Sequence, residues 1–390
     1  MYNLPSSTIA DLKEGQRQTA NIVYWVTPVG DDYEEDVYIT ESDIVQGGLT
    51  VDRQCAFGIG GATAAELSLT LYNANGKFDS VNFEHGQFTV RVGVRNWDNP
   101  DSILQNIPLG IFLTDSMPTY DRNTICVKAL DRMILFDKVV NDWSNYTFPM
   151  TVADFVAAIC ELAGVGYTYS QLMLLPNSSY MVDWHGEIDS VTLRTLLRWG
   201  AFILGANAYI NWSGELSMHG FYSSPYPMAL PVGTFDRYRS AVSKDSISVT
   251  GIEYTDAGGS VTTVGASGYV LKYSGCAILD HDVSSVLSDI LSSISNMTFS
   301  TGSLEIFSAP FLWPMDRMIY NPAGSIVPVT GMTFTINRHT RIMSEFNNVR
   351  AQGSSLPTGS DGMQISLTEA DIVYIKQLIT NALSNGLKED

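Results

Sequence analysis

The chain has 390 residues, 45% of them hydrophobic, which is enough for two to four ordinary domains. Its 22 Lys and Arg residues stand against 41 Asp and Glu residues, so the net charge is −19, and specific binding of nucleic acid through cationic side chains is not expected. No apolar run approaches the ~18 residues of a membrane span, and the first residues lack the basic and apolar stretches of a secretory signal, so we expect neither a membrane span nor export.

Residues 1–144 are predicted to form a first β-barrel domain. Apolar and polar residues alternate with a period of two, which is typical of half-buried strands. The alternating apolar residues expected in one core are Leu67, Leu69, Leu71, Val90, Val92, Ile125 and Val127. Asn73–Gly76 offers residues that tolerate positive φ, as a tight turn requires. We expect a meander of antiparallel strands, in which Gly58–Gly61 is a mobile loop.

Residues 145–225 have a different period and are predicted to form a small α+β module. Apolar residues three and four apart predict a helix that begins at Thr151 with a capping-box-like pair and ends at Gly164. A second helix is predicted after a cap at Asp189 or Ser190 and ends at Gly205. A hairpin follows, because alternating residues flank a Ser-Gly turn.

Residues 226–350 return to a period of two and are predicted to form a second β-barrel domain. The turn at Gly258-Gly259 separates two of its strands. One helix, capped by Asp282, is expected among these strands, because its apolar residues repeat at helical spacing from Val283 to Ile294.

Residues 351–365 have the composition of a flexible linker, and residues 366–390 are predicted to form a C-terminal helix. Its apolar seam is a candidate assembly interface and consists of Ile372, Ile375, Ile379 and Ala382. The spacing of three, four and three residues matches a coiled-coil seam, and isoleucine at both core positions is compatible with three strands. Two heptads are too few for a trimer alone, so the helix is expected to assist assembly; packing against its own barrel is the alternative.

The sequence contains no catalytic, metal-binding or cofactor-binding motif that rises above chance. Four cysteines lie far apart without a CxxC pair, and reduced, buried thiols are expected, with Cys126 and Cys160 at apolar positions. Five histidines are scattered without metal-ligand spacing; His185 and His219 are the two that merit inspection. The Gly58–Gly61 stretch lacks the Lys-Ser/Thr ending of a phosphate loop. We therefore predict no catalytic residues, no metal and no cofactor.

Several segments in the first 144 residues resemble the N-terminal half of the tail hub proteins of tailed bacteriophages, which have relatives in contractile injection systems. The segments are LSLTLYNANGKFD, VRVGV, PLGIFLTDSMP and ICVKALDRMILFDK, in that order. The resemblance implies a mainly β fold with an α+β insert: two tube-type β-barrel domains, a small α+β module between them, and here a C-terminal helix. It further implies a homotrimer, in which two barrels per chain imitate the six-fold symmetry of the tail tube.

The function implied by the resemblance is that of a structural hub in the virion, at the tail tip or baseplate, assembled in the host cytoplasm. Such a ring closes the tail tube and forms part of the DNA-ejection conduit, whose wall an acidic protein would suit. The implied partners are the tail tube protein, the distal tail protein, the tape measure protein and a tip spike or receptor-binding protein. The alternative is a cell-wall-degrading enzyme or a carbohydrate-binding module at the tail tip.

Overall fold

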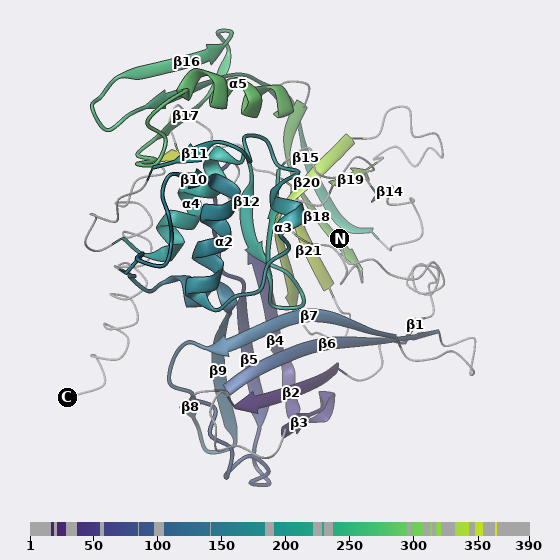
Figure 1. The fold of residues 1–390 in the computed structure, drawn as a ribbon. Coiled ribbons are helices and arrows are strands. Elements are labelled where there is room, and N and C mark those ends of the chain that lie inside the picture. Colours follow the sequence, from purple (N-terminus) through teal and green to yellow (C-terminus); the bar gives the residue numbers. More distant parts are fainter. Residues whose placement is uncertain are drawn as a thin grey trace, which may run out of the picture.

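A computed structural model describes most of the chain, and Figure 1 shows it as a ribbon. The described residues are 17–18, 22–28, 37–54, 58–84, 86–96, 105–140, 142–183, 191–220, 228–229, 237–294, 298–307, 313, 317–320, 332–342, 348–353 and 363–364. Strands predominate among the described residues, and the longer helices belong to the α+β module and to the second β unit. Among the described residues, no helix combines the length and apolar character needed to cross a bilayer.

In the described residues of the first β unit there are nine strands and two short 3-10 helices. They are β1 (Arg17–Gln18), β2 (Ile22–Pro28), β3 (Val37–Ile39), η1 (Glu41–Asp43), β4 (Ile44–Gln54), β5 (Glu66–Tyr72), β6 (Gly86–Asn96), β7 (Gln105–Thr114), β8 (Thr119–Tyr120), β9 (Thr124–Asp131) and η2 (Arg132–Phe136). In Figure 1, β6 and β7 run across β4, β5 and β9. The order differs from a simple meander, because β5 pairs with β4 and β9 instead of with β6.

The alternation predicted for the first unit is confirmed by burial. Leu67, Leu69 and Leu71 lie opposite Ala129, Val127 and Ile125 across the β5–β9 pair, and all six side chains are buried. Val90 on β6 is buried as well, whereas the side chain of Val92 lies outside the described part. The prediction of a buried thiol is wrong for Cys126, which is exposed. Cys126 lies between the buried Ile125 and Val127 on β9, and alternate side chains of a strand point to opposite faces.

The α+β module follows the first unit. It contains β10 (Met150–Thr151), α2 (Val152–Ala163), α3 (Tyr169–Leu172), β11 (Met181–Val182), α4 (Leu193–Ile203), β12 (Asn207–Ile210) and β13 (Leu216–His219). The predicted ends of α2 are confirmed, since the Thr151 hydroxyl accepts from the Asp154 N–H and Gly164 adopts φ 73°. The predicted cap of α4 at Asp189 or Ser190 is wrong: the cap is Thr192, whose side chain accepts from the Thr195 N–H.

The second β unit contains β14 (Met228–Ala229), β15 (Arg237–Thr255), β16 (Val261–Gly265), β17 (Tyr269–Ser274), α5 (Val283–Ile294), β18 (Thr298–Phe307), β19 (Arg317–Tyr320), β20 (Met332–Ile342), β21 (Asn348–Gly353) and β22 (Met363–Gln364). The strand β15 is 19 residues long and serves two sheets. Its N-terminal part pairs with β18, and its C-terminal part pairs with β16 and β17.

One continuous run of paired strands connects the two β units. From one end to the other its order is β15, β18, β21, β20, β4, β5, β9, β7, β6, β2 and β3. The predicted fold class, mainly β with an α+β insert between two β units, is confirmed. The domain boundaries at 144, 225 and 350 remain predictions.

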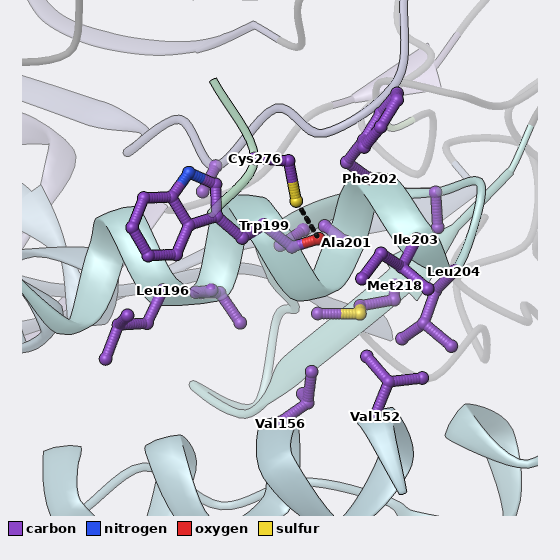
Figure 2. Close-up of a cluster of buried hydrophobic side chains, with 14 of the residues drawn as sticks. Val152, Val156, Leu196, Trp199, Ala201, Phe202, Ile203, Leu204, Met218 and Cys276 are labelled. Carbon is purple, nitrogen blue, oxygen red and sulfur yellow. Dashed lines mark hydrogen bonds between the residues drawn. The ribbon is translucent and has the colours of Figure 1, made fainter. Parts of the chain in front are cut away.

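The main core lies between the α+β module and its neighbours. Val152 and Val156 of α2 point toward α4, and the side chains of Trp199 and Phe202 extend from α4 (Figure 2). Because the same cluster of buried side chains includes Ile59 and Phe136 of the first unit and Tyr254 and Ile290 of the second, all three parts contribute to it.

Candidate functional site

The three parts of the chain meet at the junction, which we define by the Gly58–Ala62 segment, Asn207 and Tyr273. The segment lies between β4 and β5 of the first unit and is buried along its length. The Gly60 N–H donates to the Ala206 carbonyl at 2.9 Å, and the Ala208 N–H donates to the Gly61 carbonyl at 2.7 Å. These bonds attach the first unit to the α+β module in the manner of a short parallel bridge.

Two side chains complete the junction. The amide oxygen of Asn207 accepts from the Gly61 N–H at 2.7 Å, while its amide nitrogen donates to the Gly58 carbonyl at 2.7 Å. The hydroxyl of Tyr273, on β17 of the second unit, accepts from the Ile59 N–H at 3.2 Å. The three parts of the chain therefore meet at five backbone groups of four consecutive residues, 58–61, which would otherwise be buried without partners.

This geometry corrects the prediction of a mobile loop at Gly58–Gly61. The glycines are present because Gly58 and Gly60 adopt φ 129° and 87°, which side chains with a Cβ rarely do. The sequence signal of positive φ is shared by mobile loops and by tightly held ones. The distinction came from Asn207 and Tyr273, which are 149 and 214 residues from their partners in the chain and carry no sequence signal of that contact.

A second attachment joins the end of the first unit to α4. The Asp131 carboxylate accepts from the Ala65 N–H at 2.9 Å and from the Met133 N–H at 3.0 Å, so it caps η2. Arg194 of α4 donates to Asp137 at 2.7 Å and to the Met133 carbonyl at 3.0 Å. The helix α4 is thereby held against η2.

Burial determines the electrostatics of this attachment. It raises the pKa of Asp131 to about 7, against the lowering effect of its two backbone hydrogen bonds and of Arg194 and Arg53. Burial also raises the pKa of Asp137 to about 6, although Arg194 opposes it. Both carboxyl groups are thus less acidic than an exposed aspartate, which makes the attachment sensitive to pH.

The contact between α4 and the second unit is mostly apolar. The Cys276 thiol donates to the Trp199 carbonyl at 3.8 Å, as the dashed line in Figure 2 marks. The Tyr254 hydroxyl donates to the Cys276 carbonyl at 2.9 Å. Cys160 and Cys276 are buried and free, as predicted, and burial raises the pKa of both thiols well above the ordinary value.

One polar cluster has the residue types of a catalytic group. The His281 Nδ1 lies 2.6 Å from the Asp280 carboxylate and 3.1 Å from the Tyr180 hydroxyl, and the rings of Tyr180 and His281 stack at 4.4 Å. The hydroxyl also donates to the Ile278 carbonyl at 3.1 Å. The cluster links Tyr180, the residue before β11, to the segment before α5.

The other residues selected from the sequence are not brought together. His219 lies on β13 beside Tyr209, and burial lowers its pKa to about 4, so the ring is neutral at pH 7. Within the described ranges, no three His, Cys, Asp or Glu side chains form a group suited to a metal ion. His185 and the predicted seam of the C-terminal helix lie outside the described residues. The seam consists of Ile372, Ile375, Ile379 and Ala382.

Comparison with solved structures identifies similar folds. The prophage tail protein gp18 of Listeria monocytogenes EGD-e aligns with a TM-score of 0.50 and 12% identity, over 93% of this chain and 99% of that one. The 43 kDa tail protein of prophage MuSo2 from Shewanella oneidensis has a TM-score of 0.48 and 10% identity, over 87% and 100% of the two chains. No protein-family model and no curated protein matches the sequence. The resemblance to phage tail proteins is confirmed at the level of the fold.

Proposed function

From the fold that this chain shares with a prophage tail protein, we propose that it is a structural component of a phage tail, the hub of the tail tip or baseplate. The observation that carries the proposal is that the shared fold extends over nearly the whole of both chains. In this role the protein acts by holding other proteins and not by catalysis, and its place is the tail of the virion.

We propose that the hub is a homotrimer, a ring of three chains that closes the tail tube. Two contacts between the β units support this: the bond from Ile59 to Tyr273 at the junction, and the pairing of β4 with β20. In a trimer, three chains with two rigid β units each would place six β units around one axis, which would match the six-fold symmetry of a tail tube. The partners in this proposal are the tail tube, distal tail and tape measure proteins above the ring, and a tip spike or receptor-binding protein below it.

The ring would form part of the conduit through which DNA leaves the particle. The net charge of −19 supports a lumen wall that repels phosphate, so that the polymer slides without adhering. Retention of the protein on a DNA column at physiological salt would contradict this part of the proposal.

The deciding experiment is imaging of the purified protein. Negative-stain class averages are expected to show a ring with three-fold symmetry, and light scattering is expected to give three times the chain mass of 42.8 kDa. A strictly monomeric protein that releases fragments from purified peptidoglycan, with the activity abolished by one Asp or Glu substitution, would instead establish the cell-wall-degrading alternative.

The C-terminal seam is proposed as an aid to assembly. Truncation after Ile365 removes Ile372, Ile375, Ile379 and Ala382 and leaves β22 intact. The trimer of the truncated protein is expected to dissociate at a higher protein concentration than the trimer of the full-length protein. The melting temperature of the monomer is expected to be the same in both proteins. Loss of monomer stability without any change in association would show that the helix belongs to its own barrel.

A further inference from the structure

Four large apolar side chains are exposed together on the α+β module. Leu174 is 83% exposed, Met173 is 46% exposed, Tyr169 is 42% exposed and Met181 is 41% exposed. Met173 lies one helical turn after Tyr169, and its N–H donates to the Tyr169 carbonyl at 3.2 Å. Beneath them, Leu172 and Leu175 are buried, so the backbone that presents this group is anchored in the core.

The strand β11 extends the same surface. Met181 lies opposite Thr151 in the β10–β11 pair, and Thr151 caps α2 at Asp154. The Asp154 carboxylate accepts from the Tyr169 hydroxyl at 2.7 Å, which places β11, the start of α2 and α3 side by side. We call the surface made by Tyr169, Met173, Leu174 and Met181 the α3 face.

The segment of the chain that carries the α3 face contains acidic residues but no basic ones. From Val139 to Leu193 the sequence contains no Lys or Arg, whereas its acidic residues are Asp142, Asp154, Glu161, Asp183, Glu187 and Asp189. On α2, the Glu161 carboxylate accepts from the Tyr146 hydroxyl at 3.2 Å and from the Tyr167 hydroxyl at 3.1 Å, which fixes its position. An apolar surface of Met, Leu and Tyr beside the carboxylates of Asp154 and Glu161 is suited to a partner that is apolar and cationic.

We propose that the α3 face docks a basic amphipathic helix of another protein of the tail. The apolar stripe of that helix would cover Met173, Leu174 and Met181, and its Lys or Arg side chains would lie toward Asp154 and Glu161. The C-terminal segment of this chain is a poorer occupant, since residues 366–390 contain four acidic and two basic residues. The inference rests on the proposed structural role, to which it adds the place and the chemistry of one partner.

The test uses the full-length protein and a synthetic probe. The probe is an 18-residue amphipathic peptide with leucine on one face and lysine on the other, and its counterpart has glutamate in place of lysine. Fluorescence anisotropy in 0.15 M salt is expected to detect binding of the lysine peptide and at least a tenfold weaker binding of the glutamate peptide. The double variant Met173→Ser with Leu174→Ser is expected to weaken binding of the lysine peptide at least tenfold.

Matched controls separate docking at the α3 face from general attraction to an acidic protein. Met117→Ser removes a methionine that is 78% exposed on the first β unit, and Asp256→Asn removes an acid of the second unit; both should leave the affinity unchanged. Glu161→Gln should weaken binding and reduce its dependence on salt. Leu174→Ser alone is a second variant. Because Leu174 is exposed, this substitution should leave the fold intact, so a loss of binding would report on the α3 face itself.

Three outcomes would overturn the proposal. They are equal affinity for the two peptides, no effect of the serine variants, and a tenfold gain in affinity on truncation after Ile365, which would show that the chain covers the face itself. The outcome of this binding test can be distinguished from the outcome of the test of the trimeric ring. A trimer that does not bind the lysine peptide contradicts docking alone, whereas a monomer that binds it contradicts the ring.

Discussion

At the scale of single residues, buried polar side chains carry the attachment between the parts of the chain. Asn207 makes hydrogen bonds to both Gly58 and Gly61, and Asp131 accepts one from Ala65, just before β5, and one from Met133 in η2. Each of these side chains pairs backbone groups that are removed from water. Loss of such a partner costs more than a net hydrogen bond contributes, because the backbone group remains buried and unpaired.

Asn207→Ala is expected to lower the free energy of unfolding by roughly 2–4 kcal/mol, because two buried backbone groups lose their partner. Urea unfolding followed by circular dichroism measures it. Asn123→Ala, at an exposed turn, is the matched control and should change stability by less than about 0.5 kcal/mol. Equal stability of the two variants would show that the junction is held by backbone contacts alone.

The contribution of Asp131 and Asp137 to the stability of the protein is expected to fall as the pH rises from about 4 toward 7. Asp131 has a folded-state pKa of about 7 and Asp137 one of about 6, both above the ordinary 3.8 of an unfolded chain. The folded protein therefore binds more protons in this window, and the stability present at low pH is lost as these groups ionise. Urea unfolding at pH 5.5, 6.5 and 7.5 is expected to show a shallower slope in Asp131→Asn than in the parent.

The exposed carboxylate of Asp142 provides the control for this pH dependence, because hydrogen bonds to Ser144 lower its pKa. Asp142→Asn should leave the slope between pH 5.5 and 7.5 as it is in the parent. A slope that is the same in all three proteins would mean that Asp131 titrates in the folded state as it does in the unfolded chain.

At the scale of elements, α2 and α4 approach closely at one glycine. A Cβ at Gly200 would lie 2.7 Å from Val156 Cγ2, so the helices pack at this point without room for a methyl group. Val152 and Val156 face α4 in Figure 2, and both are buried. The glycine is unfavourable for helix formation by about 1 kcal/mol relative to alanine, so its place in mid-helix indicates a packing requirement.

Gly200→Ala is expected to destabilise the protein by about 1–3 kcal/mol, since overpacking outweighs the gain in helix propensity. Thermal unfolding measures the change. The double variant Gly200→Ala with Val156→Ala should lose less stability than the sum of the losses in the two single variants. Val156→Ala removes the Cγ2 atom against which the new methyl group at position 200 would clash. Strict additivity of the two effects would contradict the close contact.

The sheet of the first unit also depends on close packing, here of the buried side chains on one face of its strands. Leu69→Ala is expected to cost about 2–5 kcal/mol, because Leu69 is buried opposite Val127 on β9. Ser68→Ala, on the opposite face of the same strand, is the control and should be nearly neutral. An unchanged melting temperature in Leu69→Ala would show that this strand register is wrong.

At the scale of the whole molecule, both the sheet and the core cross the limits of the predicted domains. The pairing of β4 with β20 makes the two β units one surface, and the main core takes side chains from all three parts. Parts that share a core unfold together, since removal of one exposes the apolar surface of the next. Because the sheet and the core are continuous, a subunit of the proposed ring would transmit mechanical force from one β unit to the other.

We expect the full-length chain to unfold in one cooperative transition. Calorimetry should give a calorimetric enthalpy equal to the van't Hoff enthalpy, measured at a concentration where the association state is constant. Residues 1–144 expressed alone should bind a dye for exposed apolar surface, because Ile59 and Phe136 lose their cover. Two well-separated transitions would show that the β units are independent.

The periodic features of the protein could be predicted from the amino-acid sequence. Alternation on β5 and β9, the caps of α2 at Thr151 and Gly164, and the hairpin of β12 and β13 could be predicted, because each depends on residues close together in the chain. The class of fold followed from the order of these elements.

The way in which the parts are joined became visible only in the folded chain. The burial of Gly58–Gly61, the reach of Arg194 to Asp137 and the pairing of β4 with β20 connect residues distant in sequence. A glycine pair or a single arginine has the same local signal in an exposed loop and in a buried junction. What distinguishes the two is whether a partner lies opposite, and the chain supplies that partner only when it has folded.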